Sequence, residues 1–302
     1  MTVGDLKREV LVRHLEAWAP AALHRARRAT YVHGYADADG GVQAEAALRV
    51  FTEQSDLVRG RELAMVAVGE DVSAVDARLA RVGGTGAGLT VHTVPGGTDA
   101  RLGVALKALG AARAPLLGFL DASVAGVPPE PATVAALATG RPAEVLLVLP
   151  PGAVTDPADH RRGLRAAGFP LVAAVELATG DTAGELLLFA TTLGKSLEGF
   201  KETLWAADEF AGVRYRDPGD PERHLIDISL SPHPGPLKRE LLAHLAASGP
   251  ATVTELRTFA LTETVYRAAD ATRVLQALLG AGAVTRQPEQ GRLGGDVVIA
   301  AA

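Results

Sequence analysis

The chain has 302 residues, of which 48% are hydrophobic and 22% charged, so it can bury a sizeable core and is not a disordered chain. Its net charge of −5 excludes a surface that is basic throughout, and the lack of cysteine excludes disulfides, thiolate metal sites and cysteine nucleophiles. No apolar run reaches membrane-spanning length and the first residues are charged, so we expect a cytoplasmic protein with no membrane partner.

Residues 5–28 carry apolar side chains at helical spacing, and Pro20 predicts a break between two helices. Strands and helices then alternate, which implies a parallel sheet covered on both faces. The expected strands are Thr30–Tyr35, Leu63–Val68, Leu89–Val94, Leu116–Asp121 and Val145–Leu149. The expected helices are Val42–Val58, Val72–Val82, Ala100–Ala112, Pro131–Thr139 and Pro157–Gly168.

Two further strand-like runs, Pro170–Leu177 and Glu185–Ala190, are joined by a turn typical of a hairpin, and a helix follows over Lys195–Asp208. Five β-α units closed by a hairpin are the arrangement of the class I S-adenosylmethionine methyltransferase fold. We therefore predict an α/β fold for residues 1–212. Its Rossmann-like, class I methyltransferase-type sheet is mostly parallel and closes with an antiparallel hairpin.

The last third of the chain has a different pattern. Residues 213–236 are rich in Asp, Pro, Gly and His and are predicted to be a linker. Residues 237–302 have the pattern of a small winged helix-turn-helix. Its expected helices and strands are Leu237–Ser248, Thr252–Phe259, Ala268–Leu279, Ala283–Arg286 and Asp296–Ala301.

The turn after the first strand is where a nucleotide-type cofactor normally binds in such a fold, because glycines let the backbone approach and the next helix offers its N–H groups. Here Asp37 and Asp39 occupy that turn, and the glycines come later, at Gly40 and Gly41. Carboxylates repel an anionic ligand and fill the space that glycine leaves empty. The pair favours a polar turn that caps the next helix over a metal site, so we predict no metal.

Four segments resemble the three-Cys-motif partner proteins (TcmP family): LKREVLVRHLEAW, YVHGYADADG, LGFLDASVAG and LLLFATTLGKSLEGFKETLW. The resemblance spans most of the chain, and the last segment is its most specific part. It implies a methyltransferase-like Rossmann domain followed by a winged helix. It also implies S-adenosylmethionine as the cofactor and a radical S-adenosylmethionine protein as a partner.

The chain departs from the family pattern at three cofactor stations. Asp37-Ala38-Asp39 replaces Gly-Pro-Gly in the first turn, and His33 replaces the family Asp. The acidic residue expected to bind the cofactor ribose aligns with Gly69, and Glu70 serves only if the strand register slips by one. Asp121 remains at the end of the fourth strand, but Pro-Phe-Gly after it has become Ala-Ser-Val. Together these changes predict a degenerate cofactor site.

Several residues keep two interpretations. Asp121 is a candidate catalytic residue or the cap of the following loop. His33 is predicted to be a buried, hydrogen-bonded histidine instead of a base. The basic residues of the N-terminal helices predict a solvated face, with a nucleic-acid or acidic-partner surface as the alternative. They are His14, His24, Arg25, Arg27 and Arg28.

The winged helix has little excess positive charge for a DNA-reading module. Its candidate nucleic-acid contacts are Arg267, Arg273, Arg286 and Arg292. Protein docking and homodimerisation are the alternatives for this module.

The leading hypothesis is a methyltransferase-fold protein that binds nucleic acid or a protein partner and has lost its cofactor. The alternative is an active S-adenosylmethionine-dependent methyltransferase, with Asp121 near the methyl group, Gly34, Gly40 and Gly41 along the methionine end, and Glu70 on the ribose. An open cleft at Glu70 favours the enzyme, whereas Asp37 and Asp39 filling that cleft favour the binding protein. A third hypothesis is a purely structural component of a larger assembly.

Overall fold

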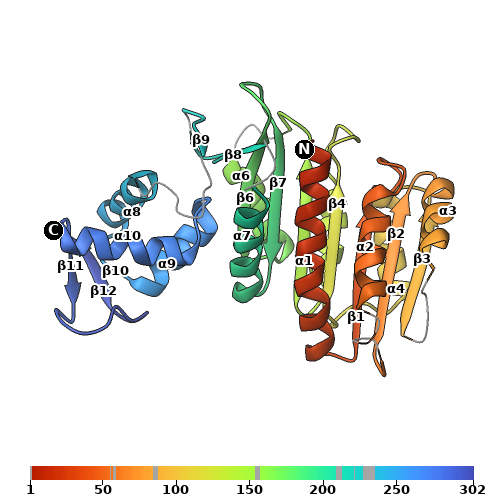
Figure 1. The fold of residues 1–302 in the computed structure, drawn as a ribbon, viewed down its shortest axis with the longest axis horizontal. Coiled ribbons are helices and arrows are strands. Elements are labelled where there is room, and N and C mark those ends of the chain that lie inside the picture. Colours follow the sequence, from red (N-terminus) through yellow and green to blue (C-terminus); the bar gives the residue numbers. More distant parts are fainter. Residues whose placement is uncertain are drawn as a thin grey trace.

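One nine-stranded sheet organises the protein, in the order β3-β2-β1-β4-β5-β7-β6-β8-β9 (Figure 1). This computed structural model describes residues 2–302 except 55, 57–58, 84–87, 154–156, 209–212, 221 and 227–234. The strands are β1 (Arg28–Gly34), β2 (Glu62–Gly69), β3 (Leu89–Pro95), β4 (Leu116–Asp121), β5 (Ala143–Leu149), β6 (Leu171–Ala178), β7 (Glu185–Thr191), β8 (Arg214–Arg216) and β9 (Leu225–Ile226).

The first five strands are parallel, and β7 is antiparallel to both β5 and β6. The sequence prediction of a mixed α/β fold with a large, mostly parallel sheet is confirmed. From β1 the chain first builds outward through β2 to β3, and it then returns to add β4 and β5 on the other side. The loops after β1 and β4 therefore diverge, which makes their carboxyl ends the topological switch point where such sheets bind ligands.

Helices cover both faces of the sheet (Figure 1). One face carries α1 (Val3–Arg25), α2 (Val42–Glu53), α3 (Ser73–Val82) and α7 (Gly194–Asp208). The other carries α4 (Thr98–Ala108), α5 (Pro131–Leu137) and α6 (Pro157–Ala167). Neighbouring strand residues belong to opposite cores, as Tyr31 and Val32 do in β1, because side chains alternate along a strand.

Helix α1 corrects one expectation, because it runs unbroken through Pro20. A proline inside a helix costs about 3 kcal/mol, since one backbone hydrogen bond is lost and the ring crowds the preceding turn. The buried side of α1 continues beyond that point with Ala22 and Leu23, whose packing against the sheet offsets the cost. Thr2 and Asp5 start the helix with a capping box.

The C-terminal part consists of three helices and a three-stranded antiparallel sheet. Its elements are α8 (Gly235–Ser248), β10 (Ala251–Thr252), α9 (Val253–Glu263), α10 (Ala268–Gly280), β11 (Val284–Gln287) and β12 (Val298–Ala301). The sheet order is β10-β12-β11. The predicted helices and strands form close to their predicted bounds. Strand β10 was not predicted, because two residues show no periodicity.

The segment predicted as a linker, residues 213–236, contributes two strands to the large sheet. Strand β8 pairs antiparallel with β6, and β9 pairs with β8. Tyr215 of β8 is buried and its hydroxyl donates to the carbonyl of Leu204 at 3.2 Å. Residues 221 and 227–234 of this segment lie outside the described residues.

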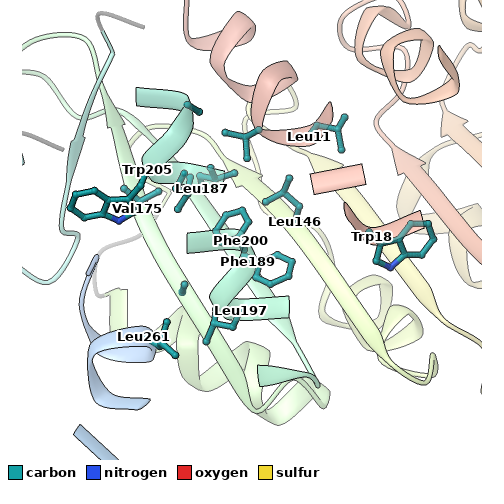
Figure 2. Packing of buried hydrophobic residues seen from close by; sticks show 14 of the residues in the cluster. Leu11, Trp18, Leu146, Val175, Leu187, Phe189, Leu197, Phe200, Trp205 and Leu261 are labelled. Atoms are coloured by element: carbon teal, nitrogen blue, oxygen red, sulfur yellow. The ribbon is translucent and has the colours of Figure 1, made fainter. Parts of the chain in front are cut away.

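Helix α7 joins the sheet to the C-terminal part. Phe200 stacks on Phe189 of β7 with ring centroids 4.4 Å apart, in the cluster that Figure 2 shows. The Trp205 indole N–H donates to the carbonyl of Val265 at 3.3 Å, and the buried Lys201 ammonium donates to that of Thr264 at 2.5 Å. Apolar packing and hydrogen bonds therefore hold the C-terminal part against the sheet.

Candidate cofactor site

A small pocket of about 260 Å³ lies at the carboxyl ends of β1 and β4. Its walls come from the start of α1, the β1–α2 turn, the start of α2 and the end of β4. Its polar lining includes Lys7, His33, Asp39, Gln43 and Asp121. The volume falls just below the roughly 300–1,000 Å³ typical of pockets that hold small molecules and cofactors.

Asp39 occupies the N-terminus of α2. Its carboxylate accepts hydrogen bonds from the backbone N–H groups of Gly41 at 2.9 Å, Val42 at 3.1 Å and Gln43 at 2.9 Å. These donors, together with the positive end of the helix dipole, are what an anionic ligand uses at such a turn. The chain's own carboxylate already holds that place, which confirms the capping interpretation for Asp39.

Asp37 contacts the end of β2, next to the turn that Asp39 caps. Its carboxylate accepts from the backbone N–H groups of Glu70 at 3.0 Å and Asp71 at 3.2 Å. A Cβ added at Gly69 would collide with this carboxylate, so the glycine leaves the room that Asp37 fills. The place of the ribose-binding acid therefore holds a side chain from the β1–α2 turn.

Glu70 does not point into this place. Gly69 is the last residue of β2 and pairs with Pro95, so the strand register does not slip. Glu70 follows the strand with an exposed side chain, and its carboxylate lies against Gly97 in the β3–α4 turn. Glu70 therefore does not occupy the last position of β2, where the residue that binds the ribose is expected.

The three candidate glycines have different roles. A Cβ at Gly34 would collide with the side chains of Leu120 and Thr98, so this glycine permits close packing inside the fold. Gly41 has φ = 83° and lies against the backbone of Val75, a conformation and an approach that a side chain would strain. Gly40 has φ = 65° and faces open space.

Asp121 is held by a lysine that sequence reasoning missed. Lys7 of α1 pairs with the Asp121 carboxylate at 2.8 Å and with Glu185 of β7 at 2.8 Å. Gln43 and Ser123 also donate to Asp121, at 3.2 and 2.5 Å. The available signal was the position of Lys7, three and four residues before Val10 and Leu11 on the buried side of α1.

Electrostatics keep Lys7 and Asp121 charged. Burial alone would raise the pKa of Asp121, but the Lys7 charge and the hydrogen bonds outweigh it and lower that pKa below its usual value. Burial likewise works to lower the pKa of Lys7, and the two carboxylates reverse this and raise it. Asp121 is therefore an ionised, fully engaged carboxylate, which is poorly suited to accept a proton.

His33 lies on the floor of the pocket as a neutral side chain. It is 1% exposed, and its Nδ1 shares a 2.8 Å hydrogen bond with the hydroxyl of Tyr31. Burial lowers the pKa of His33 to about 4, although the Asp39 and Asp121 charges oppose the shift. The prediction of a buried, hydrogen-bonded histidine is confirmed.

The four arginines predicted to contact nucleic acid differ in whether their guanidinium groups are already engaged. Arg267 binds Asp270 at 2.9 Å and Glu202 at 3.0 Å, and it lies 4.7 Å over the Trp205 ring. Arg286 donates to carbonyls of the β11–β12 loop, among them that of Pro288 at 2.8 Å. These two guanidinium groups serve the fold itself.

Arg273 and Arg292 are the other two of these four arginines. Both are exposed, and Arg273 keeps only a long 3.6 Å contact with Asp270. Within the described ranges, no cluster of three or more His, Cys, Asp or Glu residues is placed to hold a metal, and no helix is both long and apolar enough to cross a bilayer.

Comparisons with known proteins return solved methyltransferases at low similarity. No family model and no curated protein matches the chain. The chain is similar to an S-adenosylmethionine-dependent methyltransferase from Agrobacterium tumefaciens, at 14% identity over 58% of this chain and 59% of that one, with a TM-score of 0.37. It is also similar to a putative class I S-adenosylmethionine-dependent methyltransferase from Listeria monocytogenes, at 11% identity, 63% and 62% coverage, and a TM-score of 0.37.

A third similar structure is EvdMO1, at 13% identity over 58% of this chain and 40% of that one, again with a TM-score of 0.37. The chain thus spans between 40% and 62% of the length of these proteins. Similarity at this level carries no argument. The fold assignment therefore rests on strand order and direction, and function must be argued from the site.

Proposed function

We infer that this chain is a non-catalytic binding protein built on a methyltransferase-like fold, with a degenerate cofactor site. The observation that carries the proposal is the Asp39 carboxylate, which satisfies three N–H groups at the start of α2. Asp37 supports it by taking the amides at the end of β2. An incoming cofactor would have to displace both carboxylates and leave those N–H groups to find new partners.

The C-terminal part supports a winged helix as the binding module. Its elements follow one another as helix, strand, helix, helix, strand, strand, with α10 in the position of a recognition helix. The exposed positions of α10 carry one charge, that of Arg273, and Arg292 adds a second in the loop after β11. Nucleic acid is the proposed partner, and these two arginines supply phosphate contacts.

We also propose a second type of partner, a radical S-adenosylmethionine protein, because the sequence resembles the three-Cys-motif partner proteins. A homodimer formed through the same module stays a prediction. Both are compatible with a closed cofactor site, because neither requires this chain to bind S-adenosylmethionine.

One observation favours the alternative, an active methyltransferase. Asp121 ends β4 and lines the pocket of about 260 Å³, the place from which such a fold performs chemistry. Methyl transfer depends mainly on positioning, so a site without an acid or base can still act.

Titration with S-adenosylmethionine separates the two functions. Thermal unfolding of the purified protein is followed at ligand concentrations up to the millimolar range. Ligand at 100 times its dissociation constant would stabilise a binding-competent protein by about 2.7 kcal/mol, a rise of a few degrees in Tm. We expect no rise, and a saturable rise would overturn the proposal.

A pair of variants tests the reason for the closed site. Asp37→Gly/Asp39→Gly restores the small residues of the family pattern, whereas Asp37→Asn/Asp39→Asn removes the charges and keeps the volume. Binding gained by the glycine variant alone would assign the closure to filled space. Binding gained by both would assign it to charge.

A further inference from the structure

The edge of the sheet opposite the candidate site carries a row of arginines. Parallel strands all begin at the same edge, and β2, β1, β4 and β5 are neighbours in that order. Each begins at or just after arginine in the sequence. These residues, which we call the arginine edge, are Arg27, Arg28, Arg59, Arg61, Arg113 and Arg141.

Arg27, Arg28 and Arg61 form the centre of the arginine edge. With Gly60, Glu62 and Gly88 they line a surface pocket of about 560 Å³. Arg27 and Arg28 are exposed and Arg61 is partly exposed. Among the described residues, these three guanidinium groups form no salt bridge and no side-chain hydrogen bond. Other arginines are paired, as Arg49 is with Glu45 at 2.7 Å.

Few carboxylates oppose the arginine edge. Asp56 pairs with Arg59 at 3.3 Å, but both side chains are almost fully exposed, so the attraction is weak. Glu62 is the acidic residue in the central pocket. The carboxyl edge of the sheet, by contrast, carries Asp37, Asp39, Glu70, Asp71 and Asp99. Basic side chains therefore gather at one edge of the sheet and acidic side chains at the other. The basic edge stands out on a chain whose net charge is −5.

Helix dipoles do not explain this surface. Basic residues at a helix C-terminus are favourable, which accounts for His24 and Arg25 in the last turn of α1. Arg141 similarly donates to the carbonyl of Ala138 at 2.9 Å, just after α5. Arg61 precedes a strand, however, and its guanidinium donates to no carbonyl among the described residues.

The spacing suits a phosphate backbone. Neighbouring strands lie about 4.8 Å apart, so a row across four strands extends roughly 14 Å. One strand of duplex DNA presents a phosphate about every 3.4 Å along its axis, or about four phosphates over that length. Among the described residues, the lining of the central pocket contains no aromatic side chain on which a base would stack.

We propose that the arginine edge binds the phosphodiester backbone of nucleic acid, without regard to base sequence. This deepens the proposed function, on which it rests for the class of partner, and it assigns the main phosphate contacts to a surface outside the winged helix. Arg27, Arg28 and Arg61 make the central contacts, and the other three arginines extend them along the sheet edge.

Fluorescence anisotropy with labelled single-stranded RNA, single-stranded DNA and duplex DNA tests the proposal on the full chain. The test variant is R27A/R28A/R61A. A matched control, R8A/R13A/R49A, removes the same charge from ion-paired positions on α1 and α2, and R273A/R292A removes the two arginines proposed as phosphate contacts of the winged helix. Thermal unfolding checks that each variant is folded.

The affinity of the test variant should be lower by about tenfold or more. For single strands, the slope of a plot of log affinity against log salt concentration should be smaller in magnitude by about two. The matched control should keep the wild-type slope. The relative affinities of the three probes identify the form of nucleic acid that the surface prefers. An equal loss in the matched control, or a loss confined to R273A/R292A, would overturn the proposal. Absence of binding by the wild type would also overturn it, whereas the closed cofactor site is judged separately by the S-adenosylmethionine titration.

Discussion

The Asp37 carboxylate accepts a 3.0 Å hydrogen bond from the backbone N–H of Glu70, which ties the β1–α2 turn to the end of β2. Glu70 was the candidate for the cofactor ribose, and Asp37 stands in the turn where glycine is expected. In the folded chain Asp37 immobilises the backbone of Glu70, and the Glu70 side chain turns toward Gly97. The contact explains how this glycine-poor turn is accommodated: the Asp37 side chain bridges the turn and the end of β2.

Loss of the Asp37 bridge should lower stability modestly. Asp37→Ala removes the acceptor for the N–H groups of Glu70 and Asp71, and water can reach these exposed residues. We expect the free energy of unfolding to fall by about 1 kcal/mol, measured by urea denaturation. Asp37→Asn retains an acceptor oxygen and should lose less. An unchanged free energy of unfolding in Asp37→Ala would show that the hydrogen bonds contribute nothing.

Loss of the Asp39 cap should have a comparable effect on α2. Asp39→Ala leaves the N–H groups of Gly41, Val42 and Gln43 without their carboxylate. Removal of an N-terminal cap typically costs about 0.5–2 kcal/mol. Asp39→Ser restores a capping oxygen and should recover part of that cost in the same urea experiment. A serine variant no more stable than the alanine variant would contradict the capping role.

The Lys7–Asp121 pair should show strong coupling. Removing one partner of a buried ion pair leaves an uncompensated charge and typically costs about 3–5 kcal/mol. Lys7→Met should therefore destabilise the protein substantially, and Asp121→Asn should cost less, because Lys7 keeps its 2.8 Å pair with Glu185. The double variant should be less destabilised than the sum of the two, because neither charge is then left alone. Simple additivity in this double-mutant cycle would show that the pair contributes no mutual interaction.

The same pair predicts a pH dependence with two limits. The folded pKa of Asp121 is lowered, so its contribution to stability is present above the unfolded value of about 3.8 and is lost as pH falls through the folded value. The folded pKa of Lys7 is raised, so its contribution is present below about 10.5 and is lost as pH rises through the folded value. Without Lys7, burial raises the pKa of Asp121, so the stability difference between wild type and Lys7→Met, measured by urea denaturation, should be constant near neutral pH and should shrink as acid protonates Asp121 in the variant.

The sequence allowed the sheet and most of the helices to be predicted, because short apolar runs and helical periodicity are local signals. It also predicted a polar turn that caps the next helix, since Asp37 and Asp39 stand where glycine is expected, and Asp39 caps α2 in this way. The contacts that Asp121 and Arg267 make with distant residues were not predictable. Lys7 reaches Asp121 across 114 residues of chain, and Arg267 finds Glu202 on another helix. Helical periodicity places Lys7 on the buried side of α1, but it does not show which residue Lys7 contacts, because that depends on tertiary packing.

His33 should make stability depend on pH below neutrality. Its folded pKa of about 4 lies below the usual 6.5, because burial disfavours the charged ring. The unfolded chain therefore binds a proton at a pH where the folded chain does not, so stability is present above 6.5 and is lost as pH falls toward 4. We expect a loss of about 3 kcal/mol over this range, measured by urea denaturation at a series of pH values. His33→Gln, which keeps a partner for the Tyr31 hydroxyl but does not titrate, should remove most of this dependence. A glutamine variant whose stability falls as steeply as that of the wild type would assign the effect to other groups.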